Sequence, residues 1–169
     1  MADTFPEAPD SMHPGNDVRI VPYTPAYREA FFRLNQAWIE RYFEMEPRDY
    51  QVLGNPQETI LDPGGHILVA LAGGQPVGVC ALLASARPGY DFELAKMGVD
   101  PASQGRGIGR ALARAILEVA RNSGARKIFL ESSTRLPAAL SLYRKLGFRE
   151  IAGGPSPYKR SDIRMGLSL

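Results

Sequence analysis

The chain has 169 residues, with 20 Lys and Arg against 18 Asp and Glu, so its formal net charge is +2. That length suits one domain that buries a core without disulfides. The balanced charge argues against a dedicated nucleic-acid binder, which needs a strongly basic face, and against an acidic disordered chain. With one cysteine, Cys80, and two histidines, His13 and His66, an internal disulfide is excluded and no metal centre is expected.

The first sixteen residues differ in composition from the rest of the chain. Residues 1–16 contain three prolines among small and acidic residues, which is typical of a flexible tail. They lack the basic and apolar regions of a signal peptide, and no apolar run approaches the ~20 residues of a membrane span. We therefore expect a single domain over residues 17–169, located in the cytoplasm and without a membrane partner.

The domain is predicted to begin with a strand and a helix. Residues 17–22 alternate between apolar and polar, as in a half-buried strand. Thr24 and Pro25 fit the N-cap and first position of a helix, whose apolar residues then recur at three- and four-residue spacing. Two helical turns follow at 47–53 and 56–61.

Strands dominate the middle of the chain. Residues 66–71 and 76–83 predict an antiparallel hairpin around Gly73–Gly74. A further strand is expected at 92–99. An amphipathic helix then runs from Ile108 to a stop at residues 122–124.

The last third of the chain alternates strand and helix. Residues 127–131 predict a buried strand and 136–146 a helix, followed by short strands at 148–151 and 163–167. The order β-α-α-β-β-β-α-β-α-β-β predicts an α/β (α+β) domain. Its single sheet is antiparallel at first, parallel near the helix that begins at Ile108, and covered by helices.

A glycine-rich loop, Gln104–Arg110, carries the functional signal. It reads QGRGIGR and leads directly into the amphipathic helix. Unpaired N–H groups and the helix dipole favour an anion at that point, and Arg106 and Arg110 add positive charge. Neither a Walker A loop nor a dinucleotide fingerprint fits these glycines. By itself the string equally fits a helix start that needs tight turns.

Two blocks of sequence together carry a family resemblance. Residues 99–112 (VDPASQGRGIGRAL) and the pattern Ala139–x3–Tyr143–x3–Gly147–Phe148 resemble blocks of the GCN5-related N-acetyltransferase (GNAT) superfamily. The resemblance implies a GNAT-type acyl-CoA N-acyltransferase fold, with a mixed, mostly antiparallel sheet of six to seven strands and helices on both faces. It also implies an acyltransferase that moves the acetyl group of acetyl-CoA to a primary amine of a small molecule or peptide. Direct attack in a ternary complex, without a metal, is expected, and a homodimer stays open.

The same resemblance implies two surfaces for coenzyme A. Backbone amides of the glycine loop are expected to cradle the pyrophosphate, namely those of Gln104, Gly105, Arg106, Gly107, Ile108, Gly109 and Arg110. The strand segment Lys96, Met97, Gly98 and Val99 is expected to pair by its backbone with the pantetheine arm. Gly98 fits this interpretation because a strand glycine marks a bulge or a close backbone approach.

The resemblance also implies two catalytic candidates. Tyr143 is expected to be the acid that protonates the leaving thiolate; the alternative is a core residue packed on its apolar neighbours. Glu93 is expected to be the base that deprotonates the amine, since partial burial would raise its pKa. The alternatives for Glu93 are a solvent-facing residue, an ion pair with Lys96 or Arg87, and a water chain that replaces it as base.

Several residues limit these expectations. Many relatives carry Asn where this chain has Leu136, so that contact is lost or supplied by Ser132, Ser133 or Thr134. This departure supports a competing hypothesis, a non-catalytic acyl-CoA sensor or partner module on the same fold. Cys80 in its apolar strand is interpreted as a core residue, and His66 as a residue at a strand edge.

The acceptor cleft is expected between the first helices and the last loop, but its substrate is not readable. Aromatic and acidic residues there suit a cationic amine, whereas Lys159 and Arg160 equally suit an acceptor with a carboxylate. Ordinary packing and a solvated acidic helix end are equally compatible with these residues. The residues concerned are Trp38, Tyr42, Phe43, Glu44, Glu46, Asp49 and 156–162.

Overall fold

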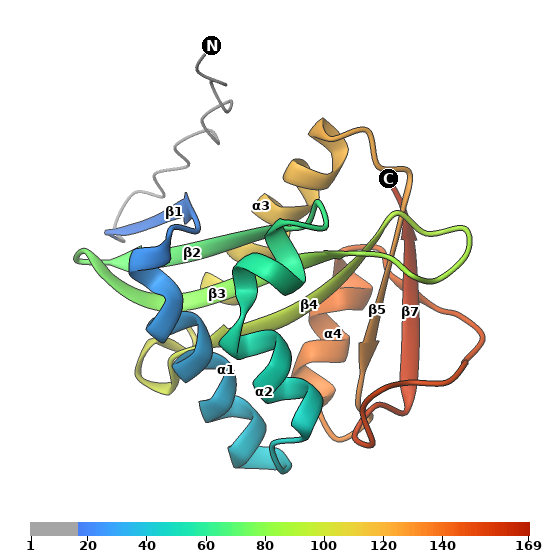
Figure 1. Ribbon diagram of the computed structural model, residues 1–169, viewed down its shortest axis with the longest axis horizontal. Coiled ribbons are helices and arrows are strands. Elements are labelled where there is room, and N and C mark those ends of the chain that lie inside the picture. The colour runs from blue at the N-terminus through green and yellow to red at the C-terminus, as the bar shows by residue number, and fades with distance from the viewer. Residues whose placement is uncertain (1–16) are drawn as a thin grey trace.

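The computed structural model describes residues 17–169, so the predicted tail at 1–16 lies outside the described residues. The described chain forms a seven-stranded sheet in the order β1-β2-β3-β4-β5-β7-β6, with helices on both faces (Figure 1). Neighbouring strands are antiparallel except β4 and β5, which are parallel. The predicted fold class and element order are therefore confirmed.

The observed elements lie close to their predicted positions. The strands are β1 (Val18–Pro22), β2 (His66–Ala72), β3 (Gln75–Ala84), β4 (Phe92–Val99), β5 (Lys127–Ser132), β6 (Arg149–Glu150) and β7 (Ile163–Ser168). The helices are α1 (Arg28–Tyr42), α2 (Pro47–Gly54), α3 (Ile108–Asn122) and α4 (Pro137–Lys145), with short helical turns at Pro25–Tyr27, Gln57–Leu61 and Pro101–Ser103.

Two local details follow from the sequence chemistry. Gly73 and Gly74 connect β2 and β3 with φ of 55° and 78°, and positive φ at both positions is what a tight two-residue hairpin requires. The helix predicted from Thr24 and Pro25 begins instead with a 3₁₀ turn, and the Thr24 side chain makes no capping hydrogen bond. The regular helix α1 starts three residues later, at Arg28.

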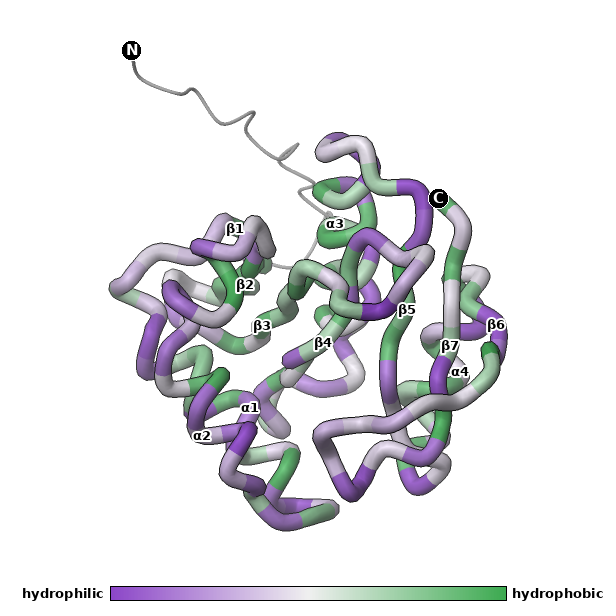
Figure 2. The backbone as a smooth tube through the Cα atoms, turned by 45° about the vertical axis from the view of Figure 1, so that its right-hand side comes forward, coloured by the Kyte–Doolittle hydropathy of each residue, from purple (hydrophilic) through white to green (hydrophobic). Residues whose placement is uncertain are grey.

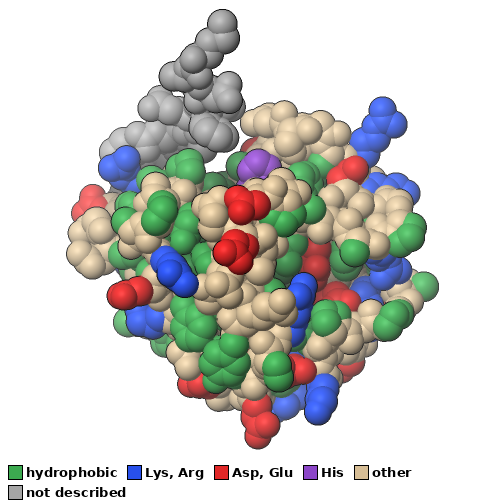
Figure 3. All heavy atoms as spheres, viewed as in Figure 1, with side chains coloured by type: hydrophobic (Ala, Val, Ile, Leu, Met, Phe, Trp, Pro, Cys, Tyr) green, Lys and Arg blue, Asp and Glu red, His purple; other side chains and the backbone are tan. Residues whose placement is uncertain are grey.

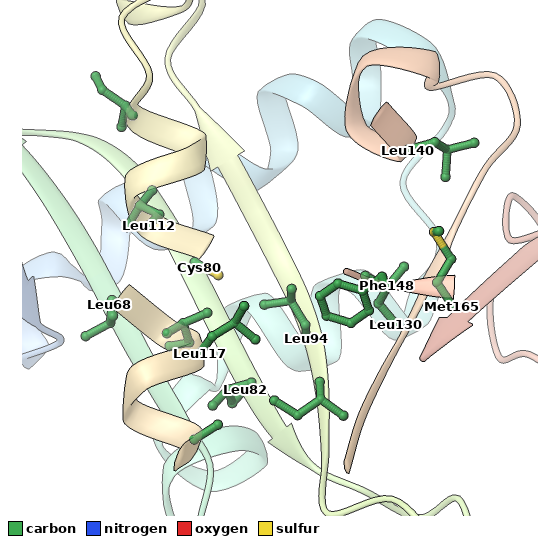
Figure 4. Packing of buried hydrophobic residues seen from close by; sticks show 14 of the residues in the cluster. Leu68, Cys80, Leu82, Leu94, Leu112, Leu117, Leu130, Leu140, Phe148 and Met165 are labelled. Carbon is green, nitrogen blue, oxygen red and sulfur yellow. The ribbon is translucent and has the colours of Figure 1, made fainter. Parts of the chain in front are cut away.

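The sheet separates two hydrophobic cores. In β3, Val79 and Ala81 belong to the core shared with α1 and α2, whereas Cys80 and Leu82 belong to the core shared with α3 and α4. This alternation is expected because successive side chains of a strand point to opposite faces. Figure 4 shows the α3 side, where Leu112 and Leu117 pack toward the sheet. In Figure 2 the tube is coloured as hydrophobic along much of β2 and β3.

The geometry of β4 creates the functional region. Its ladder with β5 covers only residues 92–94 against 128–130, after which the two strands diverge (Figure 1). On its other side, β4 carries one extra residue relative to β3 between Ala95 and Gly98. Such a bulge bends a strand and re-aims its backbone groups. Bulge and divergence together interrupt the sheet at one point.

Candidate active site

A pocket of about 970 Å³ lies at this interruption of the sheet. Its walls come from four regions. Three are β4, the glycine loop with the start of α3, and the end of β5 with the start of α4. The fourth, called the acceptor side below, consists of the end of α1 and the loop before β7. Charged side chains of both signs gather beside one another on the face viewed in Figure 3. The pocket lining includes Trp38, Phe43, Glu93, Lys96–Val99, Ser103–Gly105, Gly107–Arg110, Glu131–Ser133, Arg135, Leu136, Tyr143, Tyr158, Arg160 and Ser161.

The glycine loop forms one end of the pocket. Gly105 and Gly107 have φ of 80° and 76°, a left-handed conformation that favours glycine. An added Cβ on either would meet no atom within 4 Å, so backbone conformation explains these glycines. Gly107 is the N-cap of the 15-residue helix α3, and its first N–H groups have no partner within the helix. The loop therefore presents backbone amides at a helix start, an arrangement that suits an anion.

All the predicted cofactor residues but one line this pocket. Arg110 lines it, whereas the exposed Arg106 does not. Met97, Gly98 and Val99 line the pocket from β4.

Gly98 ends the β4 bulge and also permits a close backbone approach. A Cβ at Gly98 would lie 2.8 Å from the Leu34 carbonyl oxygen and 2.9 Å from Cδ1 of Trp38. The close backbone approach that this glycine permits is thus made to helix α1. A side chain here is excluded by packing within the protein, whether or not a ligand is bound.

Tyr143 packs against the core and also lines the pocket. Its ring packs edge-on against Phe148, with centroids 6.0 Å apart, and contributes to the α3–α4 core. The same residue lines the pocket. Burial raises the pKa of its phenol above the ordinary value, so the hydroxyl keeps its proton at neutral pH.

Glu93 lies on the opposite face of the sheet from Tyr143, since it pairs with Phe129 while its neighbour Leu94 belongs to the α3–α4 core. It lines the pocket and is partly buried. Burial and the nearby Glu131 raise the pKa of Glu93 to about 7, against the opposing effects of Lys96 and Arg48. A carboxyl with this pKa exchanges protons in the neutral range.

The side chain of Lys96 is the main feature that sequence reasoning missed. Among residues 17–169 it is the non-glycine residue with positive φ, 53°, and it occupies the β4 bulge. Its ammonium donates a 2.7 Å hydrogen bond to the Tyr158 hydroxyl and lies 3.6 Å from Oδ1 of Asp49. Burial lowers the pKa of Lys96 to about 8, although Asp49 acts in the opposite direction. The available signal was a lysine within the otherwise apolar stretch LAKMGV.

Two of the carboxylates expected to attract a cationic acceptor, Glu46 and Asp49, are paired with Arg160, whereas Glu44 is exposed. Arg160 donates to both oxygens of Asp49, at 2.6 and 2.8 Å, and its Nη1 also lies 3.2 Å from Glu46. Asp49 is fully buried. Burial opposes its ionisation, but hydrogen bonds from Arg160 and from the Glu46 amide hold its pKa below the ordinary value. These groups therefore belong to the wall of the cleft. The acidic residues that line the pocket are Glu93 and Glu131, and Glu131 accepts a hydrogen bond from Ser156 and lies 3.5 Å from Nε of Arg164.

The other candidates can be placed as well. Leu136 lines the pocket as the residue before α4, next to Ser132 and Ser133. Thr134 lies outside the pocket lining and donates to Asp162. Cys80 is fully buried, and burial raises its thiol pKa, as expected for a core residue.

His66 lies outside the pocket lining. It packs edge-on against Phe92, with ring centroids 5.8 Å apart. Within residues 17–169, no cluster of three or more His, Cys, Asp or Glu side chains could hold a metal ion. In the same part of the chain, no helix combines the length and the apolar character that crossing a membrane requires.

Comparison with known proteins links this geometry to one family. The family model for the acetyltransferase (GNAT) family matches residues 28–148. N-alpha-acetyltransferase RimI of Mycobacterium tuberculosis (strain ATCC 25618 / H37Rv) is 41% identical over 93 residues, which is 54% of this chain and 57% of the relative. The chain spans about half the length of the first curated relatives that it matches.

Solved structures share the fold. A GNAT-family acetyltransferase from Staphylococcus aureus Mu50 superposes with a TM-score of 0.79 at 21% identity, over 90% of this chain and 99% of the other. The Salmonella typhimurium protein yncA, solved with its cofactor acetyl-CoA, has a TM-score of 0.72 at 21% identity, over 91% and 95% of the two chains.

Proposed function

We propose that this chain, which belongs to the GNAT family of acetyltransferases, moves the acetyl group of acetyl-CoA to a primary amine of a small molecule or peptide. The observation that carries the proposal is the pocket itself. It brings together an anion-binding helix start, a carboxyl with a pKa near 7 and a phenol that keeps its proton. These are the groups that amine acylation by a thioester needs.

The donor side of the pocket suits coenzyme A. The amides around Gly105 and Gly107 would hold the pyrophosphate, assisted by the α3 dipole and by Arg110. The pantetheine arm would lie along Met97–Val99, where β4 has left its partner β5. The yncA structure, which contains acetyl-CoA on a similar fold, supports this assignment of the co-substrate.

The acceptor amine would react in a ternary complex. Glu93, at a pKa of about 7, takes the proton that the ammonium must lose, because a free alkyl amine has a pKa of ~10.4. The amine nitrogen attacks the thioester carbon, and backbone N–H groups near Met97–Val99 stabilise the oxyanion. The carbon–sulfur bond then breaks, and Tyr143 gives its proton to the leaving thiolate. The products are an N-acetyl amine and coenzyme A.

A thiol-release assay with acetyl-CoA and a panel of small amines and peptides tests the proposal. We expect turnover with at least one acceptor and a thermal shift on addition of coenzyme A. Absence of both would overturn the proposal. A thermal shift without turnover across a broad panel would instead favour a non-catalytic acyl-CoA-binding module, for which the Leu136 departure is the specific support.

A further inference from the structure

The side chain of Lys96 connects two parts of the site that are far apart in sequence. Lys96 forms the β4 bulge, next to the residues expected to hold the thioester. Its side chain is 5% exposed. The ammonium donates to Tyr158 in the β6–β7 loop (residues 151–162) and faces Asp49 of α2. The bulge, the loop and the helix thus meet at one buried charge.

The loop is held by the same group of residues. Arg160 pairs with Asp49 and stacks over the rings of Trp38 and Tyr158, at 5.7 and 4.4 Å from their centroids. The Lys96 ammonium lies 4.4 Å from the centroid of the Tyr158 ring. Two cations therefore flank one tyrosine, and one buried carboxylate serves both of them. This arrangement holds the loop against the acceptor side of the pocket.

A buried cation in a strained bulge is unusual unless it has a task. Desolvation disfavours the charged form of a lysine, and a left-handed backbone is unfavourable for any residue with a Cβ. Asp49 does not require this lysine, because Arg160 and the Glu46 amide already satisfy it. The partner that depends on Lys96 is the Tyr158 hydroxyl. Strain of this kind persists where the surroundings support it, often at functional sites.

We propose that Lys96 is a positioning residue, whose buried ammonium ties the β4 bulge to Tyr158 so that the acyl side and the acceptor side of the pocket keep one relative geometry. This inference rests on the proposed acetyltransferase function. Lys96 acts through the backbone of Met97–Val99 and through the loop, without contacting the reacting atoms itself. Its positive charge also acts on Glu93, which faces Glu131 of β5, Arg48 of α2 and Lys96.

Lys96→Met is the principal variant, because it keeps the side-chain length and leaves Asp49 paired with Arg160. We expect kcat to fall by about 10- to 100-fold, since small misplacements at a reacting centre have effects of this size, while the acetyl-CoA Kd changes less than about threefold. Removal of the cation also favours protonated Glu93, so the acid limb of the kcat/KM profile moves to higher pH. Lys96→Arg, which keeps the charge, is expected to retain the wild-type limb. Lys127→Met applies the same substitution to an exposed lysine and should change neither quantity.

Tyr158→Phe tests the connection itself. It retains the ring between the two cations and removes only the hydroxyl that Lys96 contacts. We expect a smaller loss of kcat than for Lys96→Met, and no further loss when the two substitutions are combined. Independent, multiplying losses in the double variant would overturn the proposal. So would a Lys96→Met enzyme with wild-type kcat, or one with a uniform loss at every pH.

Amide hydrogen exchange tests the connection without turnover and therefore separates it from the proposed function. In Lys96→Met we expect faster exchange at Met97–Val99 and at residues 158–162 together, with Lys127→Met unchanged. Faster exchange at only one of the two segments, or at neither, would overturn the connection even if the wild-type protein is an active acetyltransferase. If the wild-type protein acetylates no amine, the exchange result still decides whether Lys96 joins the two segments.

Discussion

Glu93→Gln is expected to separate catalysis from stability. In the folded protein the pKa of Glu93 rises from 4.5 to about 7, first because of burial and second because of Glu131. In the unfolded chain this carboxyl loses its proton near 4.5, so deprotonation favours the unfolded state. Between those two values the free energy of unfolding falls as pH rises. Below 4.5 the group contributes nothing, and above 7 the full destabilisation is present.

The size of this effect follows from the shift. A difference of about 2.5 pH units corresponds to about 3 kcal/mol, and this is an upper limit because Glu93 is only partly buried. Glutamine has nearly the same shape and no charge to desolvate. The variant should therefore be more stable than the wild type above pH 7, by a Tm difference on the order of 5–10 °C. The gain should vanish near pH 4.5.

Activity should change in the opposite direction. Loss of a general base costs about 10²- to 10⁴-fold in rate, so Glu93→Gln should acetylate poorly at any pH. In the wild type, kcat/KM should fall about tenfold for each pH unit below 7, as the base becomes protonated.

Thermal unfolding and kcat/KM from pH 4.5 to 9 measure both effects. Glu150→Gln, at an exposed residue of the edge strand β6, is the matched control and should alter neither profile. A Glu93→Gln enzyme with wild-type activity at pH 8 would refute the assignment of the base. A stability gain that is the same at pH 4.5 and pH 8 would refute the raised pKa.

Further substitutions test the other parts of the site. Tyr143→Phe should lower kcat by tenfold or more with little change in the acetyl-CoA Kd from calorimetry; an unchanged kcat would contradict its role as acid. Gly98→Ala should destabilise the protein by about 1–3 kcal/mol in urea unfolding, because its Cβ meets helix α1. Gly107→Ala should cost about 1–2 kcal/mol through its positive φ and weaken acetyl-CoA binding more than Arg106→Ala does. The Cys80 thiol, fully buried with a raised pKa, should react with a thiol reagent only after denaturant is added.

Local patterns in the sequence determined the elements and the donor side of the pocket. Strand alternation, helical periodicity and the glycine turns predicted all seven strands, because these signals depend on neighbours a few residues apart. The loop from Gln104 to Arg110 was found for the same reason, since a helix start and its glycines are contiguous in the chain. The parallel pairing of β4 with β5 was expected from the helix between them and is confirmed.

Only the tertiary structure decided what the side chains of the acceptor side do. Arg160 pairs with Asp49 across 111 positions, and Lys96 reaches Tyr158 across 62, separations at which a single sequence carries no pairing signal. Gly98 was expected to mark a bulge or a close backbone approach, and the fold shows that the element approaching it is helix α1. The balanced composition likewise did not indicate where the charged side chains lie in the folded protein. Glu93 and Glu131 line the pocket, with Arg164 beside Glu131, and buried cations and carboxylates neutralise one another in the pocket wall. The reason is that folding brings together charges that are distant in sequence.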